Sequence, residues 1–321
     1  MNILYTINNK YLDIMLVSFL SLYNNSNLDN IILHVITEDF SHEDYYKLQN
    51  FISNFKNTKL YIYPLESFNI EKYGIPKWRN TNISNARIFF ASILRYNLDD
   101  IDNLLYIDSD TIVKGPLDDL YKYNNNTISL TKDFLNKYYF NGYGLEKYYN
   151  SGVIYFNVKN WLNQNLEDEI IKKINKNTNY RYPDQDLINT ALKDIIKELP
   201  LKYNFAPHNL MFNDLGLKLL YNPKTRIISD KEAKAAKEDI RIMHSCGILS
   251  IKPWMNQNIN PMTEEFMTYM NMINSNFKRE ELSKLKKLLS EHKELFKLLL
   301  ILRSHTPSFI EDKVRKLIVK N

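Results

Sequence analysis

The sequence predicts an α/β fold in which one mostly parallel sheet is flanked by helices. Short apolar runs alternate with amphipathic stretches through the first half of the chain, which is typical of strands followed by helices. Several apolar runs are followed directly by polar residues, as expected where a buried strand reaches the edge of a sheet. With 321 residues, 44% of them hydrophobic, the chain can bury a sizeable core.

Each predicted element follows from its own stretch of sequence. Apolar runs bounded by polar residues predict strands at 2–7, 31–36, 59–65, 104–107, 127–132 and 151–158. Amphipathic spacing predicts helices at 11–23, 42–55, 86–98, 160–175 and 184–195. Ser84 is the predicted N-cap of the helix that contains 86–98, because its hydroxyl can accept a hydrogen bond from the first turn.

The excess positive charge lies at the C-terminal end of the chain. Residues 276–321 contain twelve Lys or Arg and six Asp or Glu, so the rest of the chain carries a net charge of −1. This nearly neutral body does not favour nucleic acid as a partner. Within the basic segment, apolar residues recur at helical spacing: Leu282, Leu285, Leu288, Leu289, Leu295, Phe296 and Leu299, and after Pro307 Phe309, Ile310, Val314, Leu317 and Ile318.

The C-terminal segment is therefore predicted to be a helical, basic and amphipathic tail. Helices of this kind lie in the interface of anionic membranes, so the tail predicts an anionic membrane surface as a partner. An ordinary helix packed on the body, or an oligomer contact, is the alternative of equal weight.

The sequence predicts a cytoplasmic protein. The N-terminal residues MNILYTINNKY lack a basic start, an apolar core and a small-residue cleavage site. No apolar run reaches the roughly 18–20 residues that a membrane-spanning helix needs. The single cysteine, Cys246, excludes an internal disulfide and any multi-cysteine zinc site. If the tail binds lipid, the protein is expected at the inner face of the membrane.

The segment LLYIDSDTIVKG (104–115) carries the clearest chemical signal. Asp108 and Asp110 follow a short apolar strand and, being two residues apart on an extended chain, can converge on one divalent cation. Mg²⁺ and Mn²⁺ prefer such oxygen ligands and keep open positions for phosphates. A turn with two solvated acids is the alternative for an isolated D-x-D. With only seven glycines and no phosphate-binding glycine motif, the chain needs a metal or another charge to neutralise a diphosphate.

Five motifs in order resemble the retaining glycosyltransferases of family 8, which have the GT-A fold: LLYIDSDTIVKGPLDDLY, NSGVIYFNVKNW, RYPDQDLINTAL, KYNFAP and MHSCGILSIKPW. The opening ILYTINNKYLDIMLVSFLSL resembles the first strand and helix of that family. The resemblance spans about residues 1–255, which are therefore predicted as a GT-A catalytic domain with a single Rossmann-like sheet. Residues 256–321 are predicted as the helical tail.

The resemblance implies a metal site for the diphosphate of a UDP-sugar donor. Asp108 and Asp110 would hold Mn²⁺, or Mg²⁺ in its place, with His244 as the third protein ligand. Ser109, between the two aspartates, either turns away or offers its backbone to the donor. Gly247 would let the backbone approach the diphosphate, and Lys252 would supply a positive charge to it. The segment HSCGILSIKPW is two residues longer between Gly247 and Lys252 than the family pattern.

The resemblance also implies where the rest of the donor binds. Thr6, Asn8 and Tyr11 follow the first strand, and Asn8 stands where the family commonly has an acidic residue that faces the uracil imide. An amide oxygen can still accept the imide N–H, and Tyr11 can stack on the base. Arg87 would contact the donor, with a salt bridge on a helix surface as the alternative. The residues implied for the transferred sugar are Asp133 and Asn150 as donor contacts, and Asp184 and Gln185 as catalytic residues.

The predicted function is retaining transfer of glucose or galactose from a UDP-sugar to a saccharide or glycolipid acceptor. The predicted setting is the synthesis of bacterial cell-surface glycans: lipopolysaccharide, capsule or glycoprotein. One alternative is a metal-dependent nucleotide-sugar hydrolase or nucleotidyltransferase, which would also use paired aspartates. The other is an inactive sugar-nucleotide-binding module. For Asp184 a helix N-cap is the competing structural role, and Asp186 is predicted to be structural.

Overall fold

The computed structural model describes residues 1–135, 137–174, 180–246, 251–257 and 259–306. The chain forms two compact units. Unit 1 consists of Met1–Asp110, Pro116–Leu130 and Tyr149–Leu199. Unit 2 consists of Thr111–Gly115, Thr131–Tyr148 and the chain from Pro200 onward. The boundary at residue 255 between a catalytic domain and a tail stays a prediction.

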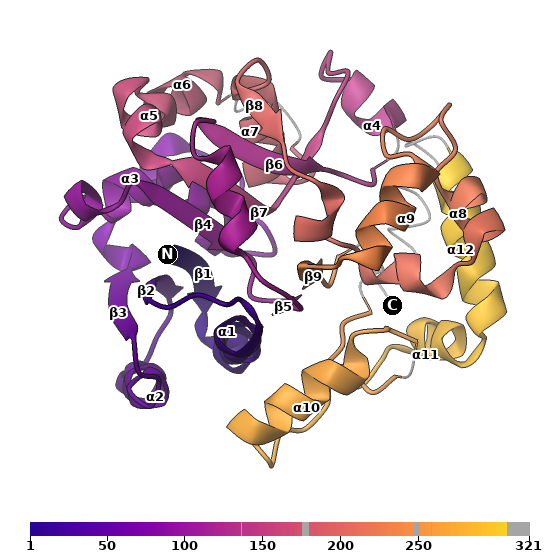
Figure 1. Ribbon diagram of the computed structural model, residues 1–321, viewed down its shortest axis with the longest axis horizontal. Helices are drawn as coiled ribbons and strands as arrows, with labels where there is room; N and C mark the ends of the chain where they lie inside the picture. The colour runs from indigo at the N-terminus through magenta and orange to yellow at the C-terminus, as the bar shows by residue number, and fades with distance from the viewer. Residues whose placement is uncertain (136, 175–179, 247–250, 258, 307–321) are drawn as a thin grey trace. The chain divides into compact units, whose positions relative to one another are not determined.

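Unit 1 is organised around a seven-stranded sheet in the order β3-β2-β1-β4-β7-β6-β8 (Figure 1). The strands are β1 (Asn2–Asn8), β2 (Ile31–Glu38), β3 (Thr58–Pro64), β4 (Asn103–Ile107), β6 (Ile128–Lys132), β7 (Tyr149–Asn157) and β8 (Ile196–Glu198). The pairs β1–β2, β2–β3, β1–β4 and β6–β8 are parallel, and β4–β7 is antiparallel. The predicted mixed, mostly parallel sheet is confirmed.

The order of the strands reverses at β1, which makes this the topological switch point of the sheet. The next strand in the chain, β2, pairs with one edge of β1, and β4 pairs in parallel with the other. Ligands of open α/β sheets bind beyond the carboxyl ends of the strands at such a reversal of strand order. Asn8 ends β1 and Asp108 directly follows β4, so both residues stand at this edge of the sheet.

The helices of unit 1 are α1 (Leu12–Asn25), α2 (His42–Ile52), α3 (Phe90–Ile93), α5 (Val158–Asn163), α6 (Leu166–Lys173) and α7 (Pro183–Ala191). The start of α2 is a capping box, in which Ser41 and Asp44 satisfy each other's backbone N–H. Helix α1 packs on β1, while α5 and α7 pack on β7. The core between these layers is built from buried aliphatic and aromatic side chains such as Leu104, Phe90, Phe156 and Trp161.

Two predicted helices of unit 1 are wrong in detail. Residues 83–93 form a 3₁₀-helix, Ile83–Phe89, followed by the short α3, and Ser84 is not its N-cap. The Arg87 Nε–H donates to the Ser84 carbonyl at 2.9 Å, which takes an acceptor that an α-helix would use for its own ladder. The helix predicted at 160–175 is split into α5 and α6 at Asn165, whose φ of 49° is left-handed.

Unit 2 contains a two-stranded antiparallel ladder of β5 (Thr111–Val113) and β9 (Ile242–His244). Its helices are α4 (Lys137–Asn141), α8 (Asp214–Leu220), α9 (Asp230–Glu238), α10 (Thr263–Ile273), α11 (Lys284–Glu291) and α12 (Lys293–His305). Additional 3₁₀ turns in the two units span Asn9–Tyr11, Leu65–Ser67, Ile70–Tyr73, Leu98–Asp100, Asp118–Tyr123, Leu201–Tyr203 and Pro207–Met211.

The described part of the predicted tail packs within unit 2. Helix α12 lies against α8 (Figure 1), and Leu289, Phe296 and Leu300 are buried. Leu288 and Leu295, predicted on the same apolar face, are exposed. The predicted apolar residues therefore lie on two faces of these helices: one face packs against unit 2, and the other is exposed at the surface. The predicted repeat at Phe309, Ile310, Val314, Leu317 and Ile318 lies outside the described residues.

Among the described helices, none is both long and apolar enough to cross a lipid bilayer.

Candidate active site

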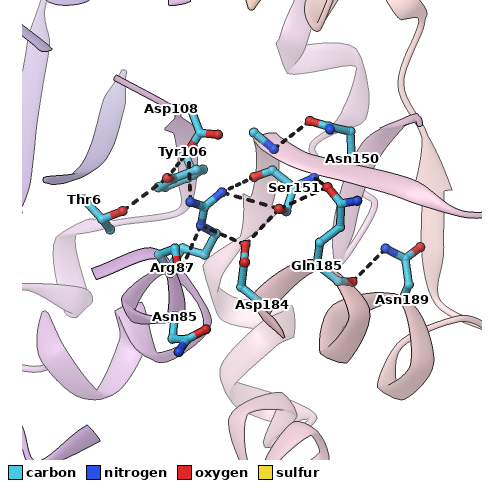
Figure 2. A network of polar contacts seen from close by, with 12 residues as sticks. Thr6, Asn85, Arg87, Tyr106, Asp108, Asn150, Ser151, Asp184, Gln185 and Asn189 are labelled. Atoms are coloured by element: carbon cyan, nitrogen blue, oxygen red, sulfur yellow. Dashed lines mark hydrogen bonds and ion pairs between the residues drawn. The ribbon is translucent and has the colours of Figure 1, made fainter. Parts of the chain in front are cut away.

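Arg87 is the centre of a buried polar network in unit 1 (Figure 2). Its guanidinium pairs with Asp108 at 3.0 Å and with Asp184 at 3.3 Å. It also donates to the Ser151 carbonyl at 2.7 Å. Burial alone would lower the pKa of Arg87, but Asp108, Tyr106 and Asp184 together raise it above its usual value. The guanidinium therefore stays charged and joins the strand that carries Asp108 to the helix that carries Asp184.

Asp184 lies inside this network. Its carboxylate accepts the Ser151 hydroxyl at 2.9 Å and faces the guanidinium of Arg87. Burial raises the pKa of Asp184, and Arg87 and Ser151 oppose that rise. The N-cap alternative for Asp184 is wrong, because Tyr182 occupies the N-cap position of α7 and Asp184 is the second residue of the helix.

Asp186 has the structural role that the sequence predicts for it. Its carboxylate accepts the backbone N–H groups of Arg181 and Tyr182, at 2.9 and 3.0 Å, just before α7 begins. These are donors at the helix start that have no partner within the helix. The two aspartates of PDQD therefore act differently: Asp186 holds the backbone, and Asp184 joins the buried network.

Gln185 is held by β7 and by its own helix. The backbone N–H of Ser151 donates to Gln185 Oε1 at 2.9 Å. Asn189, one turn further along α7, exchanges hydrogen bonds with both backbone groups of Tyr149 at 2.7 and 2.8 Å and donates to the Gln185 carbonyl at 2.9 Å. Figure 2 shows this last contact and the convergence of Gln185, Asp184 and Arg87 on Ser151. These hydrogen bonds fix helix α7 to the N-terminal end of β7.

The D-x-D segment presents one carboxylate that is partly open and one that is nearly buried. The Asp108 side chain is 23% exposed, whereas that of Arg87 is 7% exposed. Asp110 and Ser109 are buried. The hydroxyl of Tyr106, the penultimate residue of β4, donates to Asp108 Oδ1 at 2.5 Å. Asp108 is therefore anchored by protein donors while it keeps access to a ligand.

His244 is prepared as a ligand within unit 2. Its Nδ1 lies 2.9 Å from Asn204 Oδ1, and its backbone N–H donates to the Phe205 carbonyl. Because an amide oxygen can only accept, Nδ1 carries the proton and Nε2 holds the lone pair that a metal needs. In the β5–β9 ladder His244 stands opposite Thr111, and Thr111 directly follows Asp110 in the chain. Asp108 and Asp110 in unit 1, and His244 in unit 2, each offer an atom that could serve as a metal ligand.

The other predicted residues of unit 2 are Asp133, Gly247 and Lys252. Asp133 is buried and accepts the backbone N–H of Leu135 at 2.8 Å. The ammonium of Lys252 donates to the Ser245 carbonyl at 2.6 Å. The Lys252 side chain therefore contacts the residue after His244, although the sequence between Gly247 and Lys252 is two residues longer than the family pattern. Gly247 lies outside the described residues.

Among the residues predicted to contact the nucleotide, Asn8 at the end of β1 is the most informative. Its Oδ1 is buried and accepts no hydrogen bond from the described residues. The hydroxyl of Thr6 lies 3.2 Å from that of Tyr106, so its partner is a neighbouring side chain of the sheet. Tyr11 ends the 3₁₀ turn after β1. Asn150, on β7, accepts the backbone N–H of Gly152 at 2.9 Å.

Three members of the network were missed by the sequence analysis: Tyr106, Ser151 and Asn189. Tyr106 reads as one apolar residue of LLYI, and Ser151 reads as the first residue of a strand. The available signals were the positions of Tyr106 and Ser151 beside Asp108 and Asn150, and the position of Asn189 one helical turn after Gln185. Their roles depend on contacts between β1, β4, β7 and α7 that spacing does not encode.

Comparison with known proteins identifies the family. The model described as Glycosyl transferase family 8 matches residues 2–258. The lipopolysaccharide 1,2-glucosyltransferase of Escherichia coli is 26% identical over 260 residues, which cover 74% of this chain and 68% of that protein. The bifunctional glycosyltransferase WbbM has a TM-score of 0.66 at 20% identity, over 84% of this chain and 49% of its own.

The galactosyltransferase LgtC, solved with donor and acceptor sugar analogues, has a TM-score of 0.64 at 20% identity, over 85% of this chain and 96% of its own. These likenesses show that the chain has the GT-A-like α/β fold that the sequence predicts. The family match covers more than three quarters of the chain and includes all five motifs. The chain therefore belongs to glycosyltransferase family 8, and it is a glycosyltransferase.

Proposed function

We propose that this glycosyltransferase moves glucose or galactose from a UDP-sugar to a saccharide or glycolipid acceptor, with retention of configuration and with Mn²⁺, or Mg²⁺, as its metal. The proposed setting is the synthesis of bacterial cell-surface glycans, in keeping with the name of the related lipopolysaccharide 1,2-glucosyltransferase. The observation that carries the proposal is the buried chain of contacts from Asp108 through Arg87 to Asp184 and Ser151. It links a predicted metal ligand to the predicted sugar-binding residues within unit 1.

The proposed metal ligands are Asp108, Asp110 and His244. Two carboxylates and an imidazole whose Nδ1 is held by Asn204 form a donor set that suits Mn²⁺. A bound divalent cation would neutralise charge on the donor diphosphate and on the departing UDP. The Lys252 ammonium, beside the Ser245 carbonyl, is proposed to add a second positive charge to the diphosphate.

The proposed uridine contact is made by Asn8. Its buried Oδ1 accepts nothing from the described residues, and a buried acceptor without a donor is costly. The N–H of a uracil imide would supply that donor, and Tyr11 is proposed to stack on the base. Ser109, Asp133, Asn150, Thr6 and Gly247 stay predicted donor contacts.

The reacting centre is proposed to use Asp184 and Gln185. Gln185 Oε1 is engaged by the Ser151 N–H, and the Asp184 carboxylate is engaged by Arg87 and Ser151. Oxygens held by donors in this way are weak nucleophiles, which favours a front-face substitution over a covalent intermediate. In that reaction the acceptor oxygen bonds to the anomeric carbon, the bond to UDP breaks, and the leaving phosphate takes the acceptor's proton.

The test of the donor is hydrolysis in the absence of an acceptor. Purified protein is expected to release UDP from UDP-glucose or UDP-galactose slowly, and only when Mn²⁺ or Mg²⁺ is present, because the diphosphate needs its charge neutralised. UDP release is measured with a coupled assay, with EDTA and with ATP and GTP as comparison arms. With an acceptor saccharide, the NMR coupling constant of the new anomeric proton should be that of an α-linkage.

A β-linkage would exclude the retaining reaction. Turnover of nucleoside triphosphates without turnover of any UDP-sugar would favour the nucleotidyltransferase alternative. Full hydrolysis in EDTA would remove the metal from the proposal.

The outer face of α12 is proposed to contact an anionic membrane, which places the enzyme at the inner face of the cytoplasmic membrane. Leu295, Leu298 and Leu302 are exposed and lie three and four residues apart, hence on one face of the helix. Lysines flank them at positions 293 and 297. An oligomer contact through the same leucines is the competing use of this face.

The triple variant Leu295→Gln/Leu298→Gln/Leu302→Gln should bind vesicles of anionic lipid at least about tenfold more weakly than the parent, because full burial of one leucine contributes about 1.5–3 kcal/mol. Sedimentation with phosphatidylglycerol vesicles measures the effect, and donor hydrolysis should be unchanged. The control is Leu162→Gln/Met272→Gln, which removes exposed apolar side chains elsewhere. Equal vesicle binding by parent and triple variant, or a change in oligomeric state alone, would contradict the membrane proposal.

A further inference from the structure

Tyr106 has a fully buried side chain whose hydroxyl has two polar neighbours. It donates to Asp108 Oδ1 at 2.5 Å and lies 3.2 Å from the hydroxyl of Thr6 on the adjacent strand β1. Figure 2 shows the three side chains in a row from Thr6 through Tyr106 to Asp108. A sheet register of Leu4 opposite Tyr106 brings the two strands together at this point.

The direction of both hydrogen bonds is fixed by chemistry. An ionised carboxylate can only accept, so the single proton of Tyr106 points to Asp108. The Tyr106 oxygen must then accept from Thr6, whose own proton is used in that bond. Thr6 therefore acts on Asp108 through Tyr106, and its hydroxyl has only acceptor capacity left for a ligand.

The ring of Tyr106 has a second role in the same network. The Arg87 guanidinium lies over it, with the guanidinium carbon 4.4 Å from the ring centroid. Asp108 Oδ1 thus receives both the Tyr106 hydroxyl and, at 3.0 Å, the Arg87 guanidinium, two donors that are themselves in contact. Two donors from different elements fix one oxygen in position and so fix the orientation of the whole carboxylate.

We propose that Tyr106 and Thr6 are positioning residues that orient Asp108 toward a divalent cation bound to a nucleoside diphosphate. The proposal rests on the metal assignment made above for Asp108. Partners that orient a metal ligand typically change metal affinity by about 10–100-fold when they are removed. Neither residue contacts the reacting sugar in this role.

The test uses Tyr106→Phe, which keeps the ring under Arg87 and removes only the hydroxyl. With UDP present, the Kd for Mn²⁺ should rise by about 10–100-fold in calorimetric titration. In donor hydrolysis, the Mn²⁺ concentration for half-maximal rate should rise by the same factor, while the rate at saturating Mn²⁺ changes less. Thr6→Val keeps Tyr106 and should shift the Mn²⁺ Kd in the same direction by a smaller factor.

The matched control is Tyr5→Phe. Tyr5 is also fully buried, lies next to Thr6 on β1, and shares its hydroxyl with Ser18 at 2.9 Å. Tyr5→Phe should lower thermal stability as Tyr106→Phe does and leave Mn²⁺ affinity unchanged. If both variants, or neither, shift the Mn²⁺ Kd, the positioning role is overturned.

Asp108→Asn separates this proposal from the one on which it rests. If Asp108→Asn abolishes Mn²⁺ binding and Tyr106→Phe does not weaken it, the positioning role alone is wrong. If Asp108→Asn leaves Mn²⁺ binding intact, the metal assignment falls and the positioning role falls with it. If Tyr106→Phe does not fold, an unchanged Mn²⁺ Kd in Thr6→Val overturns the proposal.

Discussion

The double variant Asp108→Asn/Asp110→Asn is expected to lose donor hydrolysis by about 10³-fold or more and to lose Mn²⁺-dependent UDP binding. A divalent cation stabilises developing charge on a leaving group by several kcal/mol, and each 1.36 kcal/mol is worth about tenfold in rate. Asparagine keeps the size of both side chains. Arg87 also keeps its second partner, Asp184, so the fold should persist.

Three measurements check this result: UDP release, calorimetric binding of UDP with and without Mn²⁺, and the far-UV circular dichroism and thermal midpoint. The control is Asp99→Asn/Asp100→Asn, which removes the same two charges from an exposed 3₁₀ turn of unit 1 and should leave all three measurements unchanged. Hydrolysis at the parent rate by the Asp108/Asp110 variant would show that the metal is held elsewhere or is not needed.

Arg87→Met is expected to destabilise the protein by about 3–5 kcal/mol and to abolish donor turnover, because it leaves the carboxylates of Asp108 and Asp184 without their shared cation. The side chain is buried, so water cannot take the place of the guanidinium. The Ser151 carbonyl also loses its donor at 2.7 Å. The loss should therefore be far larger than that of a surface ion pair.

Chemical denaturation measures the stability, and UDP release at a temperature where the variant is folded measures the activity. Arg95→Met is the matched control, since Arg95 is exposed in the same unit and should change the free energy of unfolding by less than about 0.5 kcal/mol. Arg87→Lys should recover part of the stability and little of the activity, because an ammonium cannot reach three groups at once. A cost of under 1 kcal/mol for Arg87→Met would mean that the network is solvated.

The sequence was most informative where one physical signal dominates. Strands β1, β2 and β4 are apolar runs buried on both faces, and such runs are short, continuous and bounded by polar residues. Asp108 directly follows the last of these runs, so its place at an edge of the sheet could be predicted, whereas the order of the strands and the switch point come from the structure. The family motifs then identified the residues around it.

The sequence was least informative where a tertiary contact competes with the local pattern. The stretch around Arg87 has helical spacing, yet its backbone turns as a 3₁₀-helix while the Arg87 side chain bonds to Ser84 and Ser151. Asn165 interrupts a helix that amphipathicity alone would continue. In both places a side-chain hydrogen bond or a backbone conformation determines the local structure, and the periodicity of apolar residues does not reveal it.

Tyr106 shows the same limit within the site. In the run LLYI its ring is a core residue like its neighbours, and only the chain folded into a sheet reveals that its hydroxyl meets Asp108 and Thr6. Arg87 was assigned to the donor from the family pattern, but its partners Asp184 and Ser151 come from a helix and a strand far along the chain. Contacts between distant elements are not encoded in the spacing of any one motif.

The place of β7 in the sheet has a consequence for synthesis. β7 pairs antiparallel with β4, but its last residue, Asn157, leaves the ribosome 50 residues after Ile107 ends β4. At about 5–20 residues per second, the nascent chain waits roughly 3–10 s with one edge of β4 unpaired. An open apolar edge is a template for pairing with other chains. The yield of folded enzyme should therefore depend on how fast codons 108–157 are translated and on whether a chaperone covers that edge meanwhile.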